Sequence, residues 1–152
     1  MEVSEKSQAS YNRFMEYLAK SGRRFSVERG RLIEAICEMP KQFLLSDLLE
    51  YIKRHKNVYA YSTIYRNLSL LIDSGIITEY RDPDGRVAYV RGDQELLLVC
   101  VDCGKVVCVP AETELVNYET RKCEENGFLH LATHRVTRGI CPECRQDHAG
   151  DR

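Results

Sequence analysis

Two pairs of cysteines with the spacing C-x-x-C constrain this chain more than any other feature. The pairs are Cys100 with Cys103 and Cys141 with Cys144. Each pair can form a tight knuckle that turns both sulfurs toward one ion, and four thiolates complete a tetrahedral zinc shell. Such a shell has no open coordination position. The predicted cofactor is therefore one structural Zn²⁺ per chain, which staples the C-terminal segment to a much earlier strand.

The alternative for these pairs is that they are redox dithiols or ordinary core cysteines. Gly104 follows the first pair and Pro142 lies within the second, and both residues favour the tight turns of a zinc ribbon. The chain has seven cysteines, and a polar, charged segment follows Met1 where a secretory signal would have an apolar core. We therefore expect a cytoplasmic protein with reduced thiols, and no run reaches the roughly 18 apolar residues of a membrane span.

The three other cysteines are less informative. Cys37 lies on the apolar face of a predicted helix, where packing is the better interpretation, because free cysteine is among the most buried residue types. Cys108 and Cys123 have no obvious partner in the sequence, so packing and chemistry both stay open for them.

The first half of the chain shows helical periodicity followed by strand periodicity. Four helices are predicted: one around residues 11–18, one from an N-cap at Ser26 to Met39, one from an N-cap at Ser46 through Ile52, and one over 62–74 that stops at Gly75. Two strands, 76–80 and 87–90, follow around the turn-favouring segment 82–85. Helices followed by a hairpin are typical of a winged helix, whose last helix is offered to the major groove.

The second half is predicted to contain strands over 96–101 and 106–109, a helix over 111–126 and a last strand leading to Cys141. The predicted fold class is thus α+β. An N-terminal winged-helix DNA-binding domain would occupy residues 1–91, and a small α/β domain with the four-cysteine zinc site would occupy 92–152. Residues 1–91 carry a net charge of +3 and the rest a net charge of -4, so the first half is the better candidate for contact with nucleic acid.

The face of helix 62–74 opposite its apolar stripe carries small polar residues, one tyrosine and one arginine. Arg66 can bond a guanine edge or a phosphate, and the Tyr65 ring can pack on a thymine methyl group. A basic segment that includes Arg24 and Arg29 could clamp the phosphates, although a solvated charged face is the alternative. The predicted DNA-binding residues are Arg24, Arg29, Ser62, Thr63, Tyr65 and Arg66.

The chain resembles the ferric uptake regulator (Fur) family over about residues 20 to 145. The resemblance rests on motifs in the family's order: residues 24–29 (RFSVER), 61–66 (YSTIYR), 100–106 (CVDCGKV), 127–128 (GF), 134–135 (HR) and 141–144 (CPEC). It implies a winged-helix domain hinged to an α/β dimerisation domain, with a structural zinc held by the four cysteines. It also implies a homodimer that binds a palindromic duplex DNA operator. In the family, the positions matching Tyr65 and Arg66 lie in the recognition helix, and the position matching Arg24 is a basic residue near the minor groove.

The sequence departs from the family where metal-sensing members carry a histidine-rich run before the first C-x-x-C pair. Here residues 94–98 read QELLL, and leucine cannot coordinate a cation. The family's hinge histidine corresponds to Gln42 or Phe43, and the acidic ligand at the end of the wing corresponds to Val90. The usual regulatory metal site is therefore predicted to be missing.

A residual regulatory site is the alternative, with Glu95, His130, His134, Cys108 and Cys123 as its candidate ligands. An acidic residue at 112 or 114 could lie beside His134. The plainer interpretation is that all of these are surface or strand residues without a metal, because the alternation of a strand puts His130 and His134 on one face by default.

These observations predict a sequence-specific transcriptional regulator, acting as a repressor or an activator, that needs no regulatory metal. The alternative is a winged-helix and zinc-ribbon interaction module of the transcription machinery, which would bind protein and not a chosen DNA sequence. We expect neither an enzyme nor a small-molecule substrate. A Cys-His nucleophile pair could be sought between Cys123 and His130 or His134, but no orienting acid or oxyanion-hole motif accompanies it.

Overall fold

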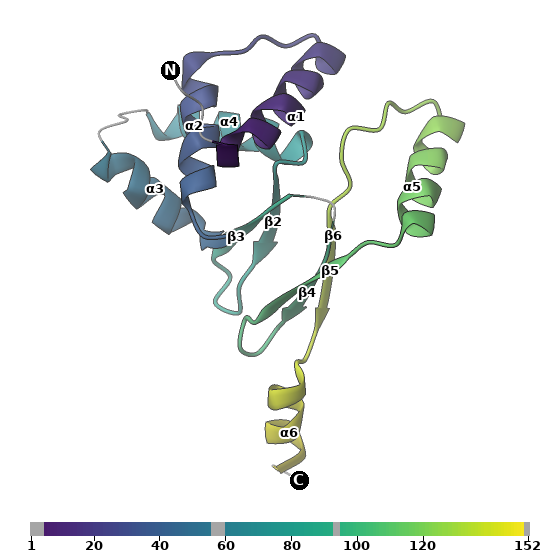
Figure 1. Ribbon diagram of the computed structural model, residues 1–152. Helices are drawn as coiled ribbons and strands as arrows, with labels where there is room; N and C mark the ends of the chain where they lie inside the picture. The colour runs from purple at the N-terminus through teal and green to yellow at the C-terminus, as the bar shows by residue number, and fades with distance from the viewer. Residues whose placement is uncertain (1–4, 56–59, 93–94, 151–152) are drawn as a thin grey trace.

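The computed structural model describes residues 5–55, 60–92 and 95–150 and contains two three-stranded sheets, each with its own helices (Figure 1). The first half contains α1 (Glu5–Ser21), α2 (Val27–Glu38), β1 (Gln42–Leu44), α3 (Leu45–Arg54), α4 (Tyr61–Asp73), β2 (Ile77–Arg81) and β3 (Val87–Arg91). The second half contains β4 (Glu95–Cys100), β5 (Val106–Pro110), α5 (Thr113–Glu125), β6 (Arg135–Gly139) and α6 (Pro142–Gly150). The predicted α+β class is confirmed. None of the helices in these ranges is both long and apolar enough to cross a bilayer.

The first four helices form one core with the first sheet. Phe14, Ile36, Leu48 and Leu71 are fully buried, one from each of α1 to α4, so every one of these helices contributes an apolar stripe. Ser26 caps α2 as predicted, because its hydroxyl accepts the backbone N–H of Arg29 at 3.2 Å. This core fixes the position of α4 immediately before the β2–β3 hairpin.

Several local predictions were wrong. The third helix begins at Leu45 and has Leu44 at its N-cap position, so Ser46 lies inside α3 and does not cap it. The reason is the short strand β1, which the sequence analysis missed: it pairs with β3 as far as Leu44, and the helix starts directly after it. α4 begins at Tyr61, one residue before the predicted range and close to the expected start, with Ala60 at the cap position. The C-terminal helix α6 was not predicted either. Met15, within the helix predicted around residues 11–18, is 49% exposed and lies outside the core.

The second sheet has the order β5-β4-β6, in which β4 is antiparallel to β5 and parallel to β6. The parallel connection runs through α5, as expected for strands that need a crossover. α5 has no buried residue, and Figure 1 shows it standing away from the sheet. The outer edge of β5 has no neighbouring strand among the described residues.

One apolar cluster joins the two sheets. Leu97 and Val99 from β4 pack against Tyr80, Ala88 and Val90 from the β2–β3 hairpin, and all five side chains are at most 6% exposed. We call these five residues the seam. The predicted boundary between residues 91 and 92 falls between β3 and β4, and the division of the chain into two domains stays a prediction.

Candidate functional site

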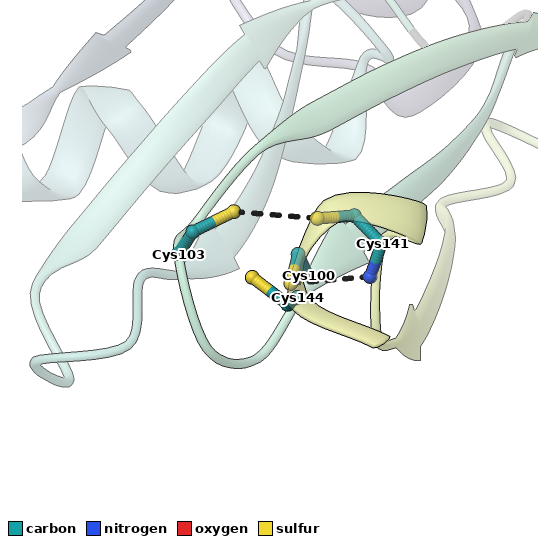
Figure 2. Close-up of side chains that lie close together, drawn as sticks. All are labelled: Cys100, Cys103, Cys141 and Cys144. Atoms are coloured by element: carbon teal, nitrogen blue, oxygen red, sulfur yellow. Dashed lines mark hydrogen bonds between the residues drawn. The ribbon is translucent and has the colours of Figure 1, made fainter. Parts of the chain in front are cut away.

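The four cysteines of the two C-x-x-C pairs come together at the end of the second sheet. Cys100 ends β4, Cys103 lies in the following turn, and Cys141 and Cys144 lie at the start of α6. Figure 2 shows the four side chains turned toward one another, and their sulfur atoms all lie within 4.8 Å of each other. The Sγ atoms of Cys103 and Cys141 are 3.7 Å apart. A tetrahedral zinc ion with Zn–S bonds of about 2.3 Å needs sulfurs about 3.8 Å apart, so the cluster suits a structural zinc site.

Backbone hydrogen bonds prepare Cys100 for ligation. The N–H groups of Cys103 and Cys141 bond its sulfur and lower the pKa of the Cys100 thiol to about 6, with Cys103 as the larger cause. The Cys141 N–H lies 3.3 Å from this sulfur. A thiolate is the form that binds a metal. The knuckle itself is closed by two bonds, from the Cys100 N–H to the Lys105 carbonyl at 2.9 Å and from the Gly104 N–H to the Cys100 carbonyl at 3.0 Å.

Side-chain contacts outside the cluster tie the two knuckles together. Lys105 follows the first knuckle and lies 3.3 Å from Glu143 in the second. Asp102, inside the first knuckle, lies 2.5 Å from His148 on α6. These contacts cross from the β4–β5 turn to the C-terminal helix, as a staple between the two segments requires.

The predicted DNA-reading face of α4 is available to a partner. Tyr65 is 50% exposed, and Ser62 and Arg66 are also exposed, whereas Thr63 is half-buried. The opposite face carries Ile64, Leu68 and Leu71 into the core, with Ile72 partly buried beside them. Helical periodicity therefore separated the two faces correctly.

Arg24 and Arg29 have different surroundings. Arg24 is exposed, and its carbonyl accepts a hydrogen bond from Nη1 of Arg29. Arg29 also donates from Nε to Oδ1 of Asn67 on α4, over 3.2 Å. Asn67 is only 7% exposed. Asn67 was not predicted to have a role, because a polar residue on an apolar helix face gives no sign of its distant partner.

The structure brings together only part of the candidate residual regulatory site. Glu95 and Cys108 are neighbours, and a lysine that was not predicted lies with them: Nζ of Lys41 is 2.8 and 2.9 Å from the two carboxylate oxygens of Glu95. This ammonium lowers the pKa of Glu95, with the hydrogen bond from Lys41 as the largest cause. Burial, followed by Glu95, raises the pKa of the Cys108 thiol. This shift disfavours the thiolate, which is the form of cysteine that binds a metal.

His134 is engaged with the winged-helix half of the chain. Its Nε2 lies 2.8 Å from the Ile72 carbonyl oxygen, which can only accept, so Nε2 carries a proton and donates. Its Nδ1 lies 3.0 Å from the Thr78 hydroxyl. Both ring nitrogens are thus used in contacts with the end of α4 and with β2. Thr78 was not singled out from the sequence.

His130 and Cys123 lie elsewhere. Nε2 of His130 is 2.7 Å from the Thr133 hydroxyl, and the imidazole lines a cleft of about 660 Å³ between α1 and α5. Cys123 is half-buried on α5. Cys37 is 4% exposed and packs in the first core, as its helical position predicted. Over residues 5–55, 60–92 and 95–150, the four cysteines are the one group of three or more histidine, cysteine or acidic residues close enough to share a metal ion.

Sequence comparison relates the chain to known regulators. The model of the ferric uptake regulator family matches residues 20–138. The ferric uptake regulation protein of Synechococcus elongatus is 25% identical over 135 residues, which are 85% of this chain and 90% of that protein. The peroxide operon regulator of Bacillus subtilis is 26% identical over 135 residues, or 86% and 90% of the two chains.

Solved structures show the same fold. The ferric uptake regulator of Helicobacter pylori, described as having three functional metal binding sites, has a TM-score of 0.57 and 17% identity over 95% of this chain and 97% of that one. A zinc uptake regulator complexed with zinc and DNA has a TM-score of 0.55 and 17% identity over 97% and 99%. At this level of identity, the likeness supports the architecture only.

Proposed function

Because the chain belongs to the ferric uptake regulator family, whose members are DNA-binding metalloregulators, we propose that it is a sequence-specific transcription regulator that binds a palindromic operator as a homodimer and needs no regulatory metal. The observation that carries this proposal is the exposed face of α4, with Tyr65 and Arg66 directed away from the core immediately before the β2–β3 hairpin. A helix in this position is the one that a winged helix inserts into the major groove.

The proposed division of work among the DNA-binding residues follows their exposure. Tyr65 and Arg66 would read base edges, and Ser62 and Thr63 would bond bases or phosphates near the start of the helix. Arg24, which is exposed, would hold a phosphate. Arg29 would act indirectly, because its bonds to the Arg24 carbonyl and to Asn67 fix the segment before α2 against α4.

The homodimer is supported by apolar surface in the second half. A helix of thirteen residues is marginal by itself, and most helical stability comes from packing of an apolar face. α5 buries nothing within one chain, yet Leu115 is 40% and Tyr118 52% exposed. Phe128 and Leu129, just after it, are 70% and 63% exposed. A second copy of the chain, meeting this surface and the free edge of β5, would cover both.

Cys100, Cys103, Cys141 and Cys144 are the proposed ligands of the structural zinc. The bound ion would supply a rigid cross-link and no reaction chemistry, because four thiolates leave it no open position. The chain's own contribution is to orient the sulfurs through the knuckle hydrogen bonds and the pairs Lys105–Glu143 and Asp102–His148.

The proposal that no regulatory metal is needed rests on the side-chain contacts between the first half of the chain and the second half. We call the region of these contacts the joint. The seam packs Leu97 between the sheets, Lys41 neutralises Glu95, and His134 uses both nitrogens in hydrogen bonds. Each of these contacts joins the DNA-reading half to the second half without an ion. These contacts would thus fix the orientation of the DNA-reading half relative to the second half, as a bound metal would otherwise do.

The test begins with selection of a binding sequence from random duplexes, followed by anisotropy titrations of the selected duplex. A selected sequence with two-fold symmetry is expected, because a two-fold dimer presents two copies of α4. Arg66→Ala should then weaken binding by about 1 to 3 kcal/mol and relax the preference at one base pair in each half-site.

Arg54→Ala is the matched control, since it removes the same charge from the same half of the chain but from α3, where Arg54 is paired with Glu50. This variant should retain the base preference. Selection that yields no preferred sequence would contradict the proposal and favour an interaction module of the transcription machinery. An Arg66→Ala variant with unchanged affinity and preference would contradict the assignment of α4 as the DNA-reading helix.

A further inference from the structure

The tip of the β2–β3 hairpin touches the first zinc knuckle. Gly104 has φ +79°, and a Cβ atom added to it would lie 2.9 Å from Cδ and 3.4 Å from Cγ of Pro83. The ring of Pro83 therefore rests against the Gly104 backbone with no space for a side chain between them. Gly85, in the same hairpin turn and also at φ +79°, has no such neighbour within 4 Å.

Both partners in this contact are held by hydrogen bonds of their own. In the hairpin turn, Oδ1 of Asp82 accepts the N–H groups of Asp84 and Arg86 at 2.9 and 2.8 Å. In the knuckle, the Gly104 N–H bonds the Cys100 carbonyl, so the position of Gly104 depends on that of a zinc ligand. Two preformed turns thus meet, and a displacement of one is passed to the other.

The hairpin is also coupled to α4. Gly75 and Ile76 connect the helix to β2, and the Ile76 N–H bonds the Leu71 carbonyl at 3.0 Å. At the other end of the hairpin, the Gly92 N–H bonds the Ile76 carbonyl at 2.7 Å. A change in the orientation of the hairpin would therefore also change the orientation of α4.

The charge of the hairpin turn agrees with a contact to protein and not to phosphate. The turn carries Asp82 and Asp84, and its one arginine, Arg86, is paired with both carboxylates at 2.8 and 3.3 Å. Arg81, the residue before the turn, donates from Nη1 to the Gly85 carbonyl at 3.0 Å. The turn from Asp82 to Arg86 therefore carries two carboxylates and one guanidinium, a net negative charge that DNA phosphates do not attract. Its remaining surface lies beside Asp102, Cys103 and Gly104, which line a cleft of about 450 Å³ together with the hairpin turn.

We propose that the first zinc knuckle is a seat for the hairpin turn, and that Gly104 and Pro83 are positioning residues which set the angle of α4 relative to the second half of the chain. The consequence for DNA binding rests on the proposed function, whereas the contact does not. β4 carries the seam residues Leu97 and Val99 and then ends in the zinc ligand Cys100, so a formed knuckle also keeps the seam in register. Loss of the ion should therefore loosen residues 77–91 within each chain, in addition to any effect on the dimer.

The test uses two glycine variants that share the same backbone conformation. Gly104→Ala should leave the zinc content unchanged, increase amide hydrogen exchange over residues 77–91, and weaken binding to the selected duplex about fivefold or more. Gly85→Ala is the matched control: it introduces a similar backbone strain but meets nothing, and it should weaken DNA binding less than twofold. Pro83→Ala leaves the knuckle intact and should by itself increase amide hydrogen exchange over residues 77–91. It tests the same contact if Gly104→Ala does not fold.

The combination of both substitutions identifies the contact. With Pro83→Ala in the same chain, the methyl group added by Gly104→Ala takes up space that the ring has left, so at least half of the lost affinity should return. Removal of zinc by a chelator should also raise exchange over 77–91. The proposal is overturned if Gly104→Ala behaves like Gly85→Ala, or if exchange over 77–91 is equal with and without zinc. If exchange responds as expected but wild-type protein prefers no duplex sequence, the proposed function fails and the contact stands.

Discussion

Arg24 and Arg29 carry the same group and belong to one basic segment, yet their surroundings give them different roles. Arg24 is exposed. Arg29 donates two hydrogen bonds within the protein, one from Nε to Asn67 and one from Nη1 to the Arg24 carbonyl. From the sequence, both looked like phosphate ligands, because charge patterning does not reveal which cation finds a partner within the fold.

This difference predicts separate outcomes for two alanine variants. Arg24→Ala should reduce the slope of log affinity against log salt concentration by about 1, because one phosphate contact is lost. Arg29→Ala should leave the salt slope unchanged and lower the free energy of unfolding by about 1 to 2 kcal/mol, since it leaves Asn67 without its bond. Anisotropy titrations over a salt series and urea denaturation measure both quantities. If Arg29→Ala also reduced the slope of log affinity against log salt concentration, Arg29 would be a phosphate ligand.

Substitution of one zinc ligand should have a different effect on zinc content from substitution of a neighbouring residue that is not a ligand. Cys144→Ser is expected to release the ion and lower the thermal midpoint, because three thiolates and a hydroxyl no longer complete the shell. Glu143→Gln, between Cys141 and Cys144, removes the ion pair with Lys105 and changes a hydrogen bond to Cys141, but it leaves all four thiolates and should retain the ion. Elemental analysis of reduced protein measures the outcome. Full zinc content in Cys144→Ser would exclude Cys144 as a ligand.

Among the secondary-structure elements, local sequence signals predicted α2 and the hairpin well. They failed for a strand that forms only because a distant strand pairs with it. The N-cap Ser26 and the turn residues 82–85 act within a few residues, so the sequence predicted α2 and the hairpin. β1 is only three residues long and exists because β3 pairs with it. No periodicity marks so short a strand, and because it was not predicted, the N-cap of α3 was placed at Ser46 and not at Leu44.

The seam is an element-scale feature that sequence reasoning saw only in part. The leucines at 96–98 were predicted as part of a strand, and that strand alternates, so that Leu97 is 2% exposed and Leu98 38% exposed. Which face meets the hairpin depends on the register between β4 and its neighbours, which the run of three leucines does not disclose.

Adjacent leucines therefore provide a matched pair. Leu97→Ala should lower the free energy of unfolding by about 2 to 5 kcal/mol, because it opens a cavity in the seam. Leu98→Ala lies on the other face, and any loss should appear as a dependence of stability on protein concentration, through the proposed dimer. Urea denaturation at two protein concentrations distinguishes the two. Equal, concentration-independent losses would show that the seam is not specific to the Leu97 face.

For the whole molecule, the four-cysteine cluster could be predicted because its spacing is local and its chemistry is unambiguous. The joint between the halves could not be predicted, because Lys41 and Glu95 are 54 positions apart, and His134 and Ile72 are 62 apart. Nothing in the local sequence of either pair specifies its partner. Only the folded arrangement reveals that residues considered as metal ligands are already occupied by hydrogen bonds and an ion pair.

The proposed dimer gives a prediction at this scale. Tyr118→Glu places a charge in the exposed apolar surface of α5, where burial against a second copy would remove its hydration, so the protein should become monomeric and bind DNA much more weakly. Asn117→Glu adds the same charge one position earlier, at an exposed polar residue, and should remain dimeric. Light scattering after size-exclusion chromatography measures the mass. A Tyr118→Glu dimer at low micromolar concentration would place the interface elsewhere.

The last prediction concerns metal control of the whole molecule. A ligand shifts a two-state joint only if it binds the two states differently, and here the side chains at the joint are already engaged: His134 with Ile72 and Thr78, and Glu95 with Lys41. We therefore expect zinc-replete protein to bind its operator with the same affinity, within threefold, before and after addition of Fe(II), Mn(II) or excess Zn(II) under reducing conditions.

His134→Ala should weaken binding equally with and without added metal, because it removes hydrogen bonds and not a metal ligand. Anisotropy titrations of both proteins in each metal measure this. A gain of about tenfold on metal addition, which corresponds to about 1.4 kcal/mol of coupling, would contradict the prediction, and its loss in His134→Ala would identify His134 as a ligand. That result would require His134 to give up its bonds to the winged-helix half for an ion, and the joint would then be a metal switch.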